Sequence, residues 1–418
     1  MASTGGGAAL AAIHLTDPSG AAAPSCTPQS PTLIISTHRT LYELGAHEPS
    51  QCIRVVSTGL GKYYGVVPLV DAAPWLLIGS QSRLASSLRS NSTGLPRTKD
   101  ALLLVHPRLG SATAAWILQT EYLHDMTRAD DGLIYAVDSA NGIVSEYGIQ
   151  VTSAAAAPAH ARSAAPGWLA LPHPASSFAR VSLRRLIPTV PLLSGPPGEA
   201  HANNVLATRG QLWVMHHNRL RRSAIHVLER SSGKRLRVLP LAGSECHNPL
   251  FHKGAVLYLL SAVGGLARLS SNGSSTTLWT AGPGWFAKGL AVVDDIAYFG
   301  VSPKAHRGDE RNNVPSKLVA YGLDANKVLS RTPLPHPGLI NAISAPRIAP
   351  SCSWRACDTR TPGGAHGAAR EQEGATSRHE PDPVDWRLVG SGSGPTAAGN
   401  STGSTMGSAW QWPWGRRD

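Results

Sequence analysis

Long apolar runs, helical periodicity and charge are all scarce in this sequence. No apolar run reaches the ~18 residues that a membrane-spanning helix needs, so the sequence predicts no membrane span. Charged residues make up only 15% of the 418 residues, against 42% apolar residues. Long exposed helices need both a periodic apolar stripe and many surface charges. We therefore expect a packed core made mainly of strands.

Cysteine is also scarce, and no targeting signal is visible. The five cysteines are odd in number and scattered, which is not the pattern of a disulfide framework. Cys352 and Cys357 lack a second pair of ligands, so they make a poor zinc site. The segment MASTGGGAALAAIHLTDPSG has no basic start and no long apolar core, unlike a secretory signal. We expect a soluble protein of the cytoplasm or of an organelle.

Negative charge is outweighed by positive charge, with a formal net charge of +12. Such a balance can indicate nucleic acid, anionic membranes or acidic substrates as partners. Many of the basic residues lie in one third of the chain: Arg180, Arg184, Arg185, Arg209, Arg219, Arg221, Arg222, Arg230, Lys234, Arg235 and Arg237. No RNA-binding or zinc-finger pattern accompanies them. The sequence favours a solvated basic rim over a nucleic-acid site.

Turn residues are abundant in the sequence and separate short strand-like runs. Gly (42) and Pro (32) are frequent, and runs such as GQLWVMHHN and IAYFGVS alternate with polar turns. Six similar strand openings recur, at 61–69, 121–129, 199–207, 244–252, 285–293 and 337–345. The shortest spacings, about 40 to 45 residues, match a four-stranded propeller blade.

The longer spacings contain insertions, and the two ends of the chain differ from the rest in composition. The insertions are a polar loop (86–99), a low-complexity loop (152–167) and a charged loop (303–316). We expect a disordered segment at 1–31, a propeller at 32–349 and a disordered, low-complexity tail at 350–418.

The two ends of the propeller region complement each other. The last opening, at 337–345, is followed by no blade, whereas three strand-like runs (32–38, 39–45 and 52–57) precede the first. Pairing the N-terminal strands with the strand at 338–345 would close the ring and remove a free sheet edge. The sequence therefore predicts an all-β, six-bladed propeller. An irregular β-sandwich, the alternative, gives no reason for six similar openings.

Aligning the openings places one polar residue of each in a single column: Tyr64, His124, Asn203, His247, Lys288 and Asn341. The first strand of each blade lines the central channel, so this column should point toward the axis. Residues two positions earlier share that face: Lys62, Tyr122, His201, Glu245, Phe286 and Leu339. The next column, represented by Asp125, Asn204 and Asn248, should face the other way and tie neighbouring blades.

Three interpretations of the polar column stay open. The column could bind a small polar or anionic ligand, with Lys288 beside Trp285 and Phe286 holding a carboxylate or phosphate. His124, His201 and His247 could hold a transition metal, because imidazole suits such ions. Otherwise the channel wall simply binds water, and the protein is a scaffold for a protein partner.

An enzyme at the same place is the runner-up to the ligand site. His124, His247 and Lys288 would then act as acids and bases, with or without a metal ion, as in a hydrolase or lyase. No nucleophile elbow, P-loop or dinucleotide fingerprint is present to narrow the reaction.

Residues 32–346 resemble a family of uncharacterised propeller-like proteins, best known from bacteria and described only as a domain of unknown function. The likeness lies in HANNV, GQLWVMHHN, ECHNPLF, LYLLSAVGGLARL, WFAKGLAV, YFGVSPKAHRGDERNN, SKLVAYGLD, PGLINAISAP and, earlier, LHDMTRADDGLIYAVD. The family tends to have Arg where Lys288 stands. More distantly, the chain resembles lactonase-type and strictosidine-synthase-like propellers. The lactonases use a carboxylate-rich calcium site, a pattern not matched here. The resemblance implies a fold and no activity.

Overall fold

A computed structural model describes most of residues 31–345. The described ranges are 31–58, 62–69, 75–81, 100–106, 111–118, 120, 122–153, 168–171, 177–189, 201–208, 210–217, 221–305 and 310–345. These residues form β-strands and two single-turn 3-10 helices, η3 (Ser261–Val263) and η4 (Glu310–Asn312). Neither of these helices is long and apolar enough to cross a membrane.

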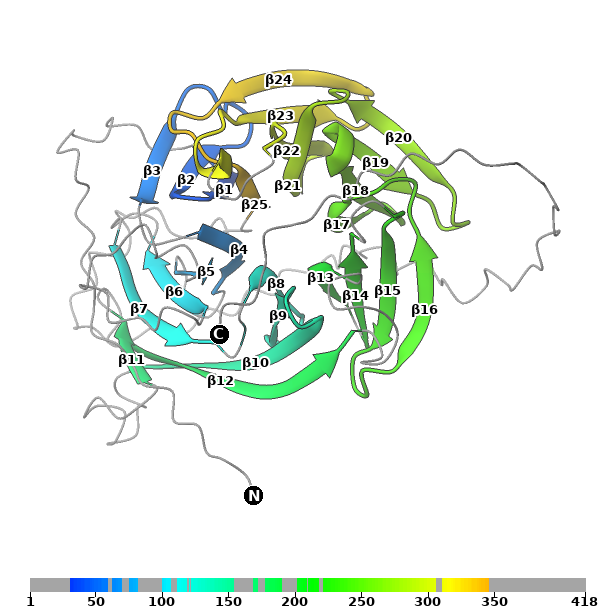
Figure 1. Ribbon diagram of the computed structural model, residues 1–418. Coiled ribbons are helices and arrows are strands. Elements are labelled where there is room, and N and C mark those ends of the chain that lie inside the picture. The colour runs from blue at the N-terminus through cyan, green and yellow to red at the C-terminus, as the bar shows by residue number, and fades with distance from the viewer. Residues whose placement is uncertain are drawn as a thin grey trace, which may run out of the picture. The chain divides into compact units, whose positions relative to one another are not determined.

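Six antiparallel sheets stand around a common axis and form a six-bladed β-propeller (Figure 1). Blade 1 consists, from the axis outward, of β25 (Ile340–Ser344), β1 (Thr32–Thr37), β2 (Thr40–Gly45) and β3 (Ile53–Thr58). Blade 2 consists of β4 (Lys62–Pro68), β5 (Leu76–Gln81), β6 (Ala101–His106) and β7 (Ser111–Ile117). Blade 3 consists of β8 (Leu123–Arg128), β9 (Ile134–Asp138), β10 (Ile143–Ser153), β12 (Ser177–Pro188) and β11 (Trp168–Leu171).

The other three blades have four strands each, in chain order. Blade 4 consists of β13 (Ala202–Thr208), β14 (Gln211–His216), β15 (Ala224–Glu229) and β16 (Arg235–Pro240). Blade 5 consists of β17 (His247–His252), β18 (Ala255–Leu260), β19 (Gly265–Leu269) and β20 (Ser275–Thr280). Blade 6 consists of β21 (Trp285–Val293), β22 (Ile296–Pro303), β23 (Lys317–Gly322) and β24 (Lys327–Pro333). The inner strands contact one another in a closed circle.

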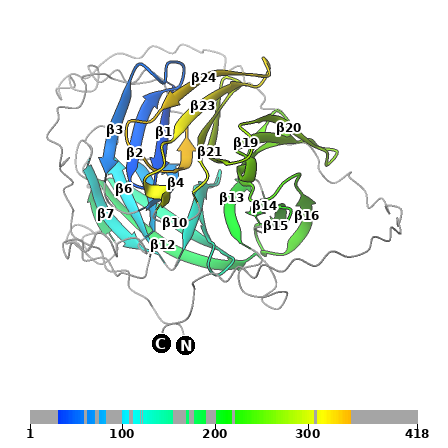
Figure 2. The same ribbon diagram turned by 45° about the horizontal axis from the view of Figure 1, so that its top comes forward.

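The ring closes through blade 1, as the sequence predicts. β25 pairs antiparallel with β1, with Ser344 opposite Ile34 and Ile343 opposite Ile35. Figure 2 shows β1, β2 and β3 of this blade side by side. A strand from one end of the propeller region thus completes a sheet begun at the other end. This pairing occupies the inner edge of β1, which would otherwise be free to pair with another chain.

Blade 3 departs from the expected four strands. β10 runs on to Ser153 and pairs with the long β12, and β11 adds a fifth strand at the rim. The predicted loop at 152–167 therefore begins two residues too early, because Thr152 and Ser153 belong to β10. Residues 154–167 and the predicted loop at 86–99 lie outside the described residues. So do 1–30 and 346–418.

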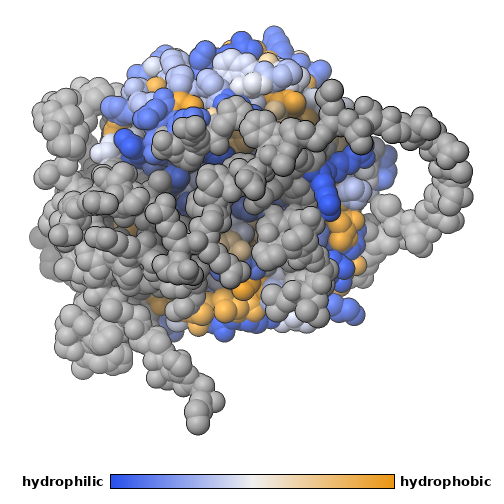
Figure 3. Space-filling model, in the orientation of Figure 1, coloured by the Kyte–Doolittle hydropathy of each residue, from blue (hydrophilic) through white to orange (hydrophobic). Residues whose placement is uncertain are grey.

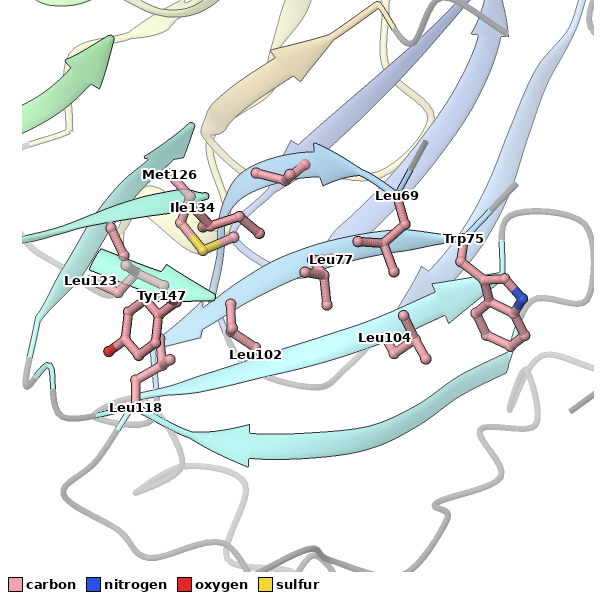
Figure 4. Close-up of a cluster of buried hydrophobic side chains, with 12 residues drawn as sticks. Leu69, Trp75, Leu77, Leu102, Leu104, Leu118, Leu123, Met126, Ile134 and Tyr147 are labelled. Carbon is pink, nitrogen blue, oxygen red and sulfur yellow. The ribbon is translucent and has the colours of Figure 1, made fainter. Parts of the chain in front are cut away.

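Apolar side chains from facing sheets fill the space between blades. Between blades 2 and 3, Leu77 and Leu102 pack with Leu123, Met126 and Tyr147 (Figure 4). Burying each such side chain contributes about 1.5–3 kcal/mol. Similar clusters lie between other blades. Strands such as β1 and β5 are buried along their whole length because both faces of their sheets are covered.

The described surface is mostly hydrophilic on the face that Figure 3 shows, with a few hydrophobic patches. Some arginines of the predicted basic rim form hydrogen bonds within the protein. Arg185 of β12 donates to the Glu146 carboxylate at 2.7 Å and to the backbone carbonyl of Arg230 in blade 4. Arg230 in turn donates to Asp131 at 2.7 Å. These bonds tie blade 3 to blade 4.

Cysteine behaves differently at its two described positions. Cys52 is disulfide-bonded, although the odd number and scattered positions of the cysteines indicate no disulfide framework. Cys246 is free and buried, and burial raises its pKa to about 12. A thiol with such a pKa is a poor nucleophile, which removes Cys246 from the candidate reactive groups.

Candidate functional site

The polar column falls on an irregularity that all six inner strands share. In each of them the pairing register against the neighbouring strand shifts where the column residue stands. A β-bulge inserts an extra residue and turns a side chain in a new direction. Side chains alternate between the two faces of a strand. The bulges therefore explain how the column residue of every inner strand can point toward the axis.

The bulges take two forms. In β8, β13 and β25 the unpaired residue is the column residue itself, His124, Asn203 or Asn341. In β4, β17 and β21 the residue after the column residue has a positive φ: Gly65 (71°), Asn248 (50°) and Gly289 (76°). Glycine and asparagine are the residues that adopt this left-handed conformation most readily.

Two of these bulges also need glycine for space. A Cβ on Gly65 would lie 2.7 Å from the backbone nitrogen of Met126 in blade 3. A Cβ on Gly289 would lie 2.8 Å from Cγ2 of Ile340 in blade 1. The inner strands can approach this closely only because no side chain stands there.

Four column residues meet at the axis. The ring centres of Tyr64 and His124 are 5.3 Å apart, and those of His124 and His247 are 5.5 Å apart with the rings stacked. Nζ of Lys288 lies 3.5 Å from Nε2 of His124 and 4.5 Å from the centre of the Tyr64 ring. We call Tyr64, His124, His247 and Lys288 the axial cluster; all four are buried.

The other two column residues lie beside the axis and bridge blades. The amide of Asn203 donates to the carbonyl of Cys246 in blade 5 at 2.8 Å. The amide of Asn341 donates to the carbonyl of Tyr63 in blade 2 at 2.9 Å. Because a carbonyl can only accept, each amide must present its nitrogen there. The Oδ1 atoms of Asn203 and Asn341 are buried and have no hydrogen-bond partner among the described residues.

Hydrogen bonds decide the tautomers of the two axial histidines. Nδ1 of His124 lies 2.9 Å from the carbonyl oxygen of Asn203, and Nδ1 of His247 lies 2.8 Å from that of Glu245. Both Nδ1 atoms must carry the proton, since carbonyl oxygens only accept. In the neutral rings each Nε2 then has a lone pair, and that of His124 faces the Lys288 ammonium.

The structure adds residues that the column does not contain. His38, in the turn after β1, accepts from the hydroxyl of Tyr64 at its Nε2 (3.2 Å) and donates from Nδ1 to Oδ1 of Asn312 (3.0 Å). Asn312 belongs to η4 in the predicted charged loop at 303–316. Neither residue belongs to a repeated opening, so an alignment of openings could not find them.

Cations outnumber anions around Lys288. Burial, then the charges of Arg311 and Lys62, hold the pKa of Lys288 well below its usual range, and the Asp125 carboxylate offsets this in part. Burial and then the charge of Lys288 likewise lower the pKa of His124 and of His247. Among the described residues Lys288 forms no ion pair. The cluster therefore combines a desolvated amine with neutral imidazoles.

The histidines proposed as metal ligands do come together. His201 and His247 each have a ring centre within about 5.5 Å of that of His124 (5.4 and 5.5 Å), and His217 lies 4.4 Å from His201. Within the described ranges, however, no group of three or more His, Cys, Asp or Glu side chains has the arrangement of a metal site. The rings of His124 and His247 stack, and the Nδ1 atom of each is bonded to a backbone carbonyl.

The second column forms a relay between blades, as predicted. The side-chain amide of Asn204 donates to the Asp125 carboxylate at 2.9 Å. Oδ1 of Asn204 accepts from the backbone nitrogen of Asn248 at 2.9 Å, and Oδ1 of Asn248 accepts from that of Gly289 at 2.7 Å. This relay joins the inner strands of blades 3, 4, 5 and 6.

The fold and its centre thus define a six-bladed β-propeller with buried polar and cationic groups on the axis. No family model matches the chain, and no curated protein matches it. Among solved structures, a chain of a nidogen/laminin complex is similar, with 11% identity and a TM-score of 0.47 over 75% of this chain and 97% of that one.

Two further structures are similar to the same degree. A protein of unknown function from Bacteroides caccae has 11% identity and a TM-score of 0.46, over 76% of this chain and 98% of that one. A protein from Lactobacillus plantarum has 10% identity and a TM-score of 0.46, over 75% and 98%. These values describe likeness of fold alone.

Proposed function

We propose that this propeller binds a small anion at the axial cluster, with Lys288 as the principal contact. The observation that carries the proposal is the burial of Lys288, only 3% exposed, without an ion-pair partner among the described residues. An isolated ammonium is costly to bury, and proteins normally compensate it with a carboxylate. A carboxylate or phosphate group of a ligand would supply that compensation.

The surroundings of Lys288 favour an anion over a cation. The charges of Arg311 and Lys62 add to that of Lys288, and each lowers its pKa. Asp125 acts in the opposite direction, but it is one carboxylate against the two cations Arg311 and Lys62. The local potential at the axis is therefore positive, which attracts negatively charged groups.

The ligand would also carry hydrogen-bond donors. The unpaired Oδ1 atoms of Asn203 and Asn341 each cost about 1–3 kcal/mol if nothing donates to them. Hydroxyl groups of the ligand, or water carried with it, would satisfy these oxygens. A small hydroxylated acid fits both requirements better than a fully apolar molecule does.

An enzyme remains the second candidate at the same place. The lone pair on Nε2 of His124, 3.5 Å from the Lys288 nitrogen, supports acid–base chemistry. The resemblance to an uncharacterised propeller family fits either candidate, because that family has no assigned activity.

Ligand binding can be tested by thermal unfolding with phosphate, sulfate and small hydroxy acids. A ligand present at 100 times its Kd stabilises the folded state by about 2.7 kcal/mol. We expect the Tm of the wild-type protein to rise with at least one anion, and no rise for Lys288→Met. Lys253→Met is the matched control, because Lys253 is exposed and pairs with Asp295 at 2.8 Å. An unchanged response in Lys288→Met would overturn the proposal.

A further inference from the structure

We propose that Lys288 is a nucleophile that forms an imine with the carbonyl carbon of a small 2-oxo acid, and that His124 is its base. This inference rests on the proposed anion site and assigns a substrate class to it. A 2-oxo acid carries an anionic carboxylate next to an electrophilic carbonyl, which matches a cationic centre that contains an amine.

The geometry places a base at the amine. Nζ of Lys288 lies 3.5 Å from Nε2 of His124, and Nε2 carries the lone pair because Nδ1 donates to the carbonyl of Asn203. A general base must lie within hydrogen-bond reach of the proton that it takes, and this distance tightens readily on binding. Asn203 thus orients His124 as a positioning residue.

The environment makes the amine reactive. An amine attacks a carbonyl only in its neutral form, and enzymes obtain neutral lysine by desolvation or by a second cation nearby. Both conditions hold here: Lys288 is buried against the Tyr64 ring, and the charges of Arg311 and Lys62 lower its pKa further. The same cations would hold the carboxylate of the 2-oxo acid.

The reaction needs no further reagent. The Lys288 nitrogen forms a bond to the carbonyl carbon, and the carbonyl π electrons move to the oxygen. His124 takes a proton from the nitrogen and returns one to the oxygen, giving a carbinolamine. His124 then takes the remaining proton from the nitrogen and gives it to the hydroxyl group, which leaves as water as the C=N bond forms. One amine and one carbonyl thus give one imine and one water, without oxidation or reduction.

The site departs from that of a lysine that merely fills space. A structural lysine would extend its ammonium to solvent or to a carboxylate. Instead Lys288 stands on a bulge that directs it at the axis, immediately before Gly289 with its positive φ of 76°. Gly289 adopts the left-handed conformation that this bulge needs, so the backbone keeps the Lys288 side chain directed at the axis.

Reductive trapping tests the inference. The full-length protein is incubated with glyoxylate and sodium cyanoborohydride, and the modified lysines are located by peptide mass spectrometry. We expect trapping at Lys288 to be about tenfold or more faster than at the exposed Lys253, Lys317 and Lys327, because Lys288 alone of these four has a base beside it and a desolvated amine. Equal labelling of all four, or none at Lys288, would overturn the proposal.

Two comparisons separate its parts. His124→Asn keeps a side-chain donor for the Asn203 carbonyl but lacks Nε2, so the trapping rate at Lys288 should fall about 100-fold. An unchanged rate would overturn the role of His124. Propanal, a carbonyl compound without a charge, should label Lys288 more slowly than glyoxylate does; equal rates would overturn the assignment to oxo acids.

Failure of the imine and failure of the anion site are distinguishable. Lactate has the carboxylate of a 2-oxo acid but no carbonyl, so it reports on the anion site alone. If lactate or phosphate raises the Tm through Lys288 and glyoxylate leaves no adduct there, the imine is wrong and the anion site stands. If no anion binds and no adduct forms, both proposals are wrong.

Discussion

The carboxylate of Asp125 in blade 3 accepts a hydrogen bond of 2.9 Å from the side chain of Asn204 in blade 4. The same oxygen lies 3.4 Å from the backbone nitrogen of Val205. This is the first link of the relay that continues through Asn248 to Gly289. Inner strands of neighbouring blades share no backbone ladder, so side-chain bonds of this kind fix their relative positions. These side-chain hydrogen bonds therefore also determine the geometry of the axial cluster.

The Asp125 link predicts a pH dependence of stability. Burial raises the pKa of Asp125 from 3.8 to about 6. The folded protein then binds this proton more tightly than the unfolded chain does, so stability falls as the pH rises from about 4 to about 6. The loss amounts to at most about 3 kcal/mol. Asp125→Asn cannot titrate and should lack this part of the profile.

Urea unfolding of both proteins at several pH values between about 4 and 7 measures the effect. The free energy of unfolding of Asp125→Asn, relative to wild type, should increase across this range and level off above about pH 6. Parallel profiles for the two proteins would show that Asp125 keeps an ordinary pKa.

Gly289→Ala should destabilise the propeller through two separate costs. Its φ of 76° disfavours any Cβ, and that Cβ would lie 2.8 Å from Ile340 and 3.0 Å from Ile343 of blade 1. Gly273→Ala is the matched control, because its φ is 83° and nothing lies within 4 Å of its Cβ. We expect a loss of about 1–2 kcal/mol for the control and a further 1–3 kcal/mol for Gly289→Ala. Chemical unfolding measures the loss of stability in each variant. Equal losses for Gly289→Ala and Gly273→Ala would mean that blade 1 moves to make room for the added Cβ.

The periodic parts of the structure could be predicted from the sequence. Six similar openings predict six inner strands, and the unmatched strand at 337–345 predicts the closure that β25 and β1 confirm. The polar column could be predicted because each blade repeats it at a fixed place. In three inner strands a Gly or Asn directly follows the column residue, as a bulge with a left-handed residue requires: Tyr64-Gly65, His247-Asn248 and Lys288-Gly289. This bulge explains the orientation of the column side chains.

The parts without repetition could not be predicted. His38 lies in a turn and Asn312 in a one-turn helix, and their hydrogen bond joins positions 274 residues apart. Neither position recurs in other blades, so nothing in the pattern distinguishes them from solvated loop residues. The fifth strand of blade 3 could not be predicted for a similar reason: a low-complexity stretch separates β10 from β11 and β12 in the sequence.

Removing the charge of Lys288 should stabilise the protein when no ligand is bound. Lys288→Met replaces a buried amine, which has no ion pair among the described residues, by an apolar chain of similar length. Replacing buried ion pairs by apolar residues is neutral or stabilises by about 1–4 kcal/mol, and we expect a gain of this order here. Because the pKa of Lys288 is lowered, the stability difference between Lys288→Met and wild type depends on pH. The folded wild type binds this proton less tightly than the unfolded chain, so wild-type stability rises with pH up to about 10.5.

The difference between Lys288→Met and wild type should therefore shrink as the pH is raised from about 7 to 9, and should shrink at pH 7 when a binding anion is added. Urea unfolding with and without phosphate measures both changes. A variant that is less stable than wild type under all these conditions would show that Lys288 is compensated within the protein.

Closure of the ring predicts that β25 is indispensable although it is short. Ile340, Ala342 and Ile343 are buried, and β25 occupies the inner edge of β1. A chain that ends at residue 338 loses these contacts and should lose on the order of 5 kcal/mol or more, which most domains cannot spare. A chain that ends at residue 349 keeps every described strand and is the matched control. We expect cooperative thermal unfolding for the longer chain only.

A peptide supplied in trans separates loss of closure from general damage. The segment 337–349, added to the chain that ends at 338, should pair with β1 and restore cooperative unfolding at high peptide concentration. The same peptide with Ile343→Asp should fail, because it would place a carboxylate among the buried side chains that Ile343 contacts. Restoration by both peptides would mean that backbone pairing with β1 suffices. A shorter chain that unfolds cooperatively without peptide would contradict the role of β25, since its blade would then be stable with an open inner edge.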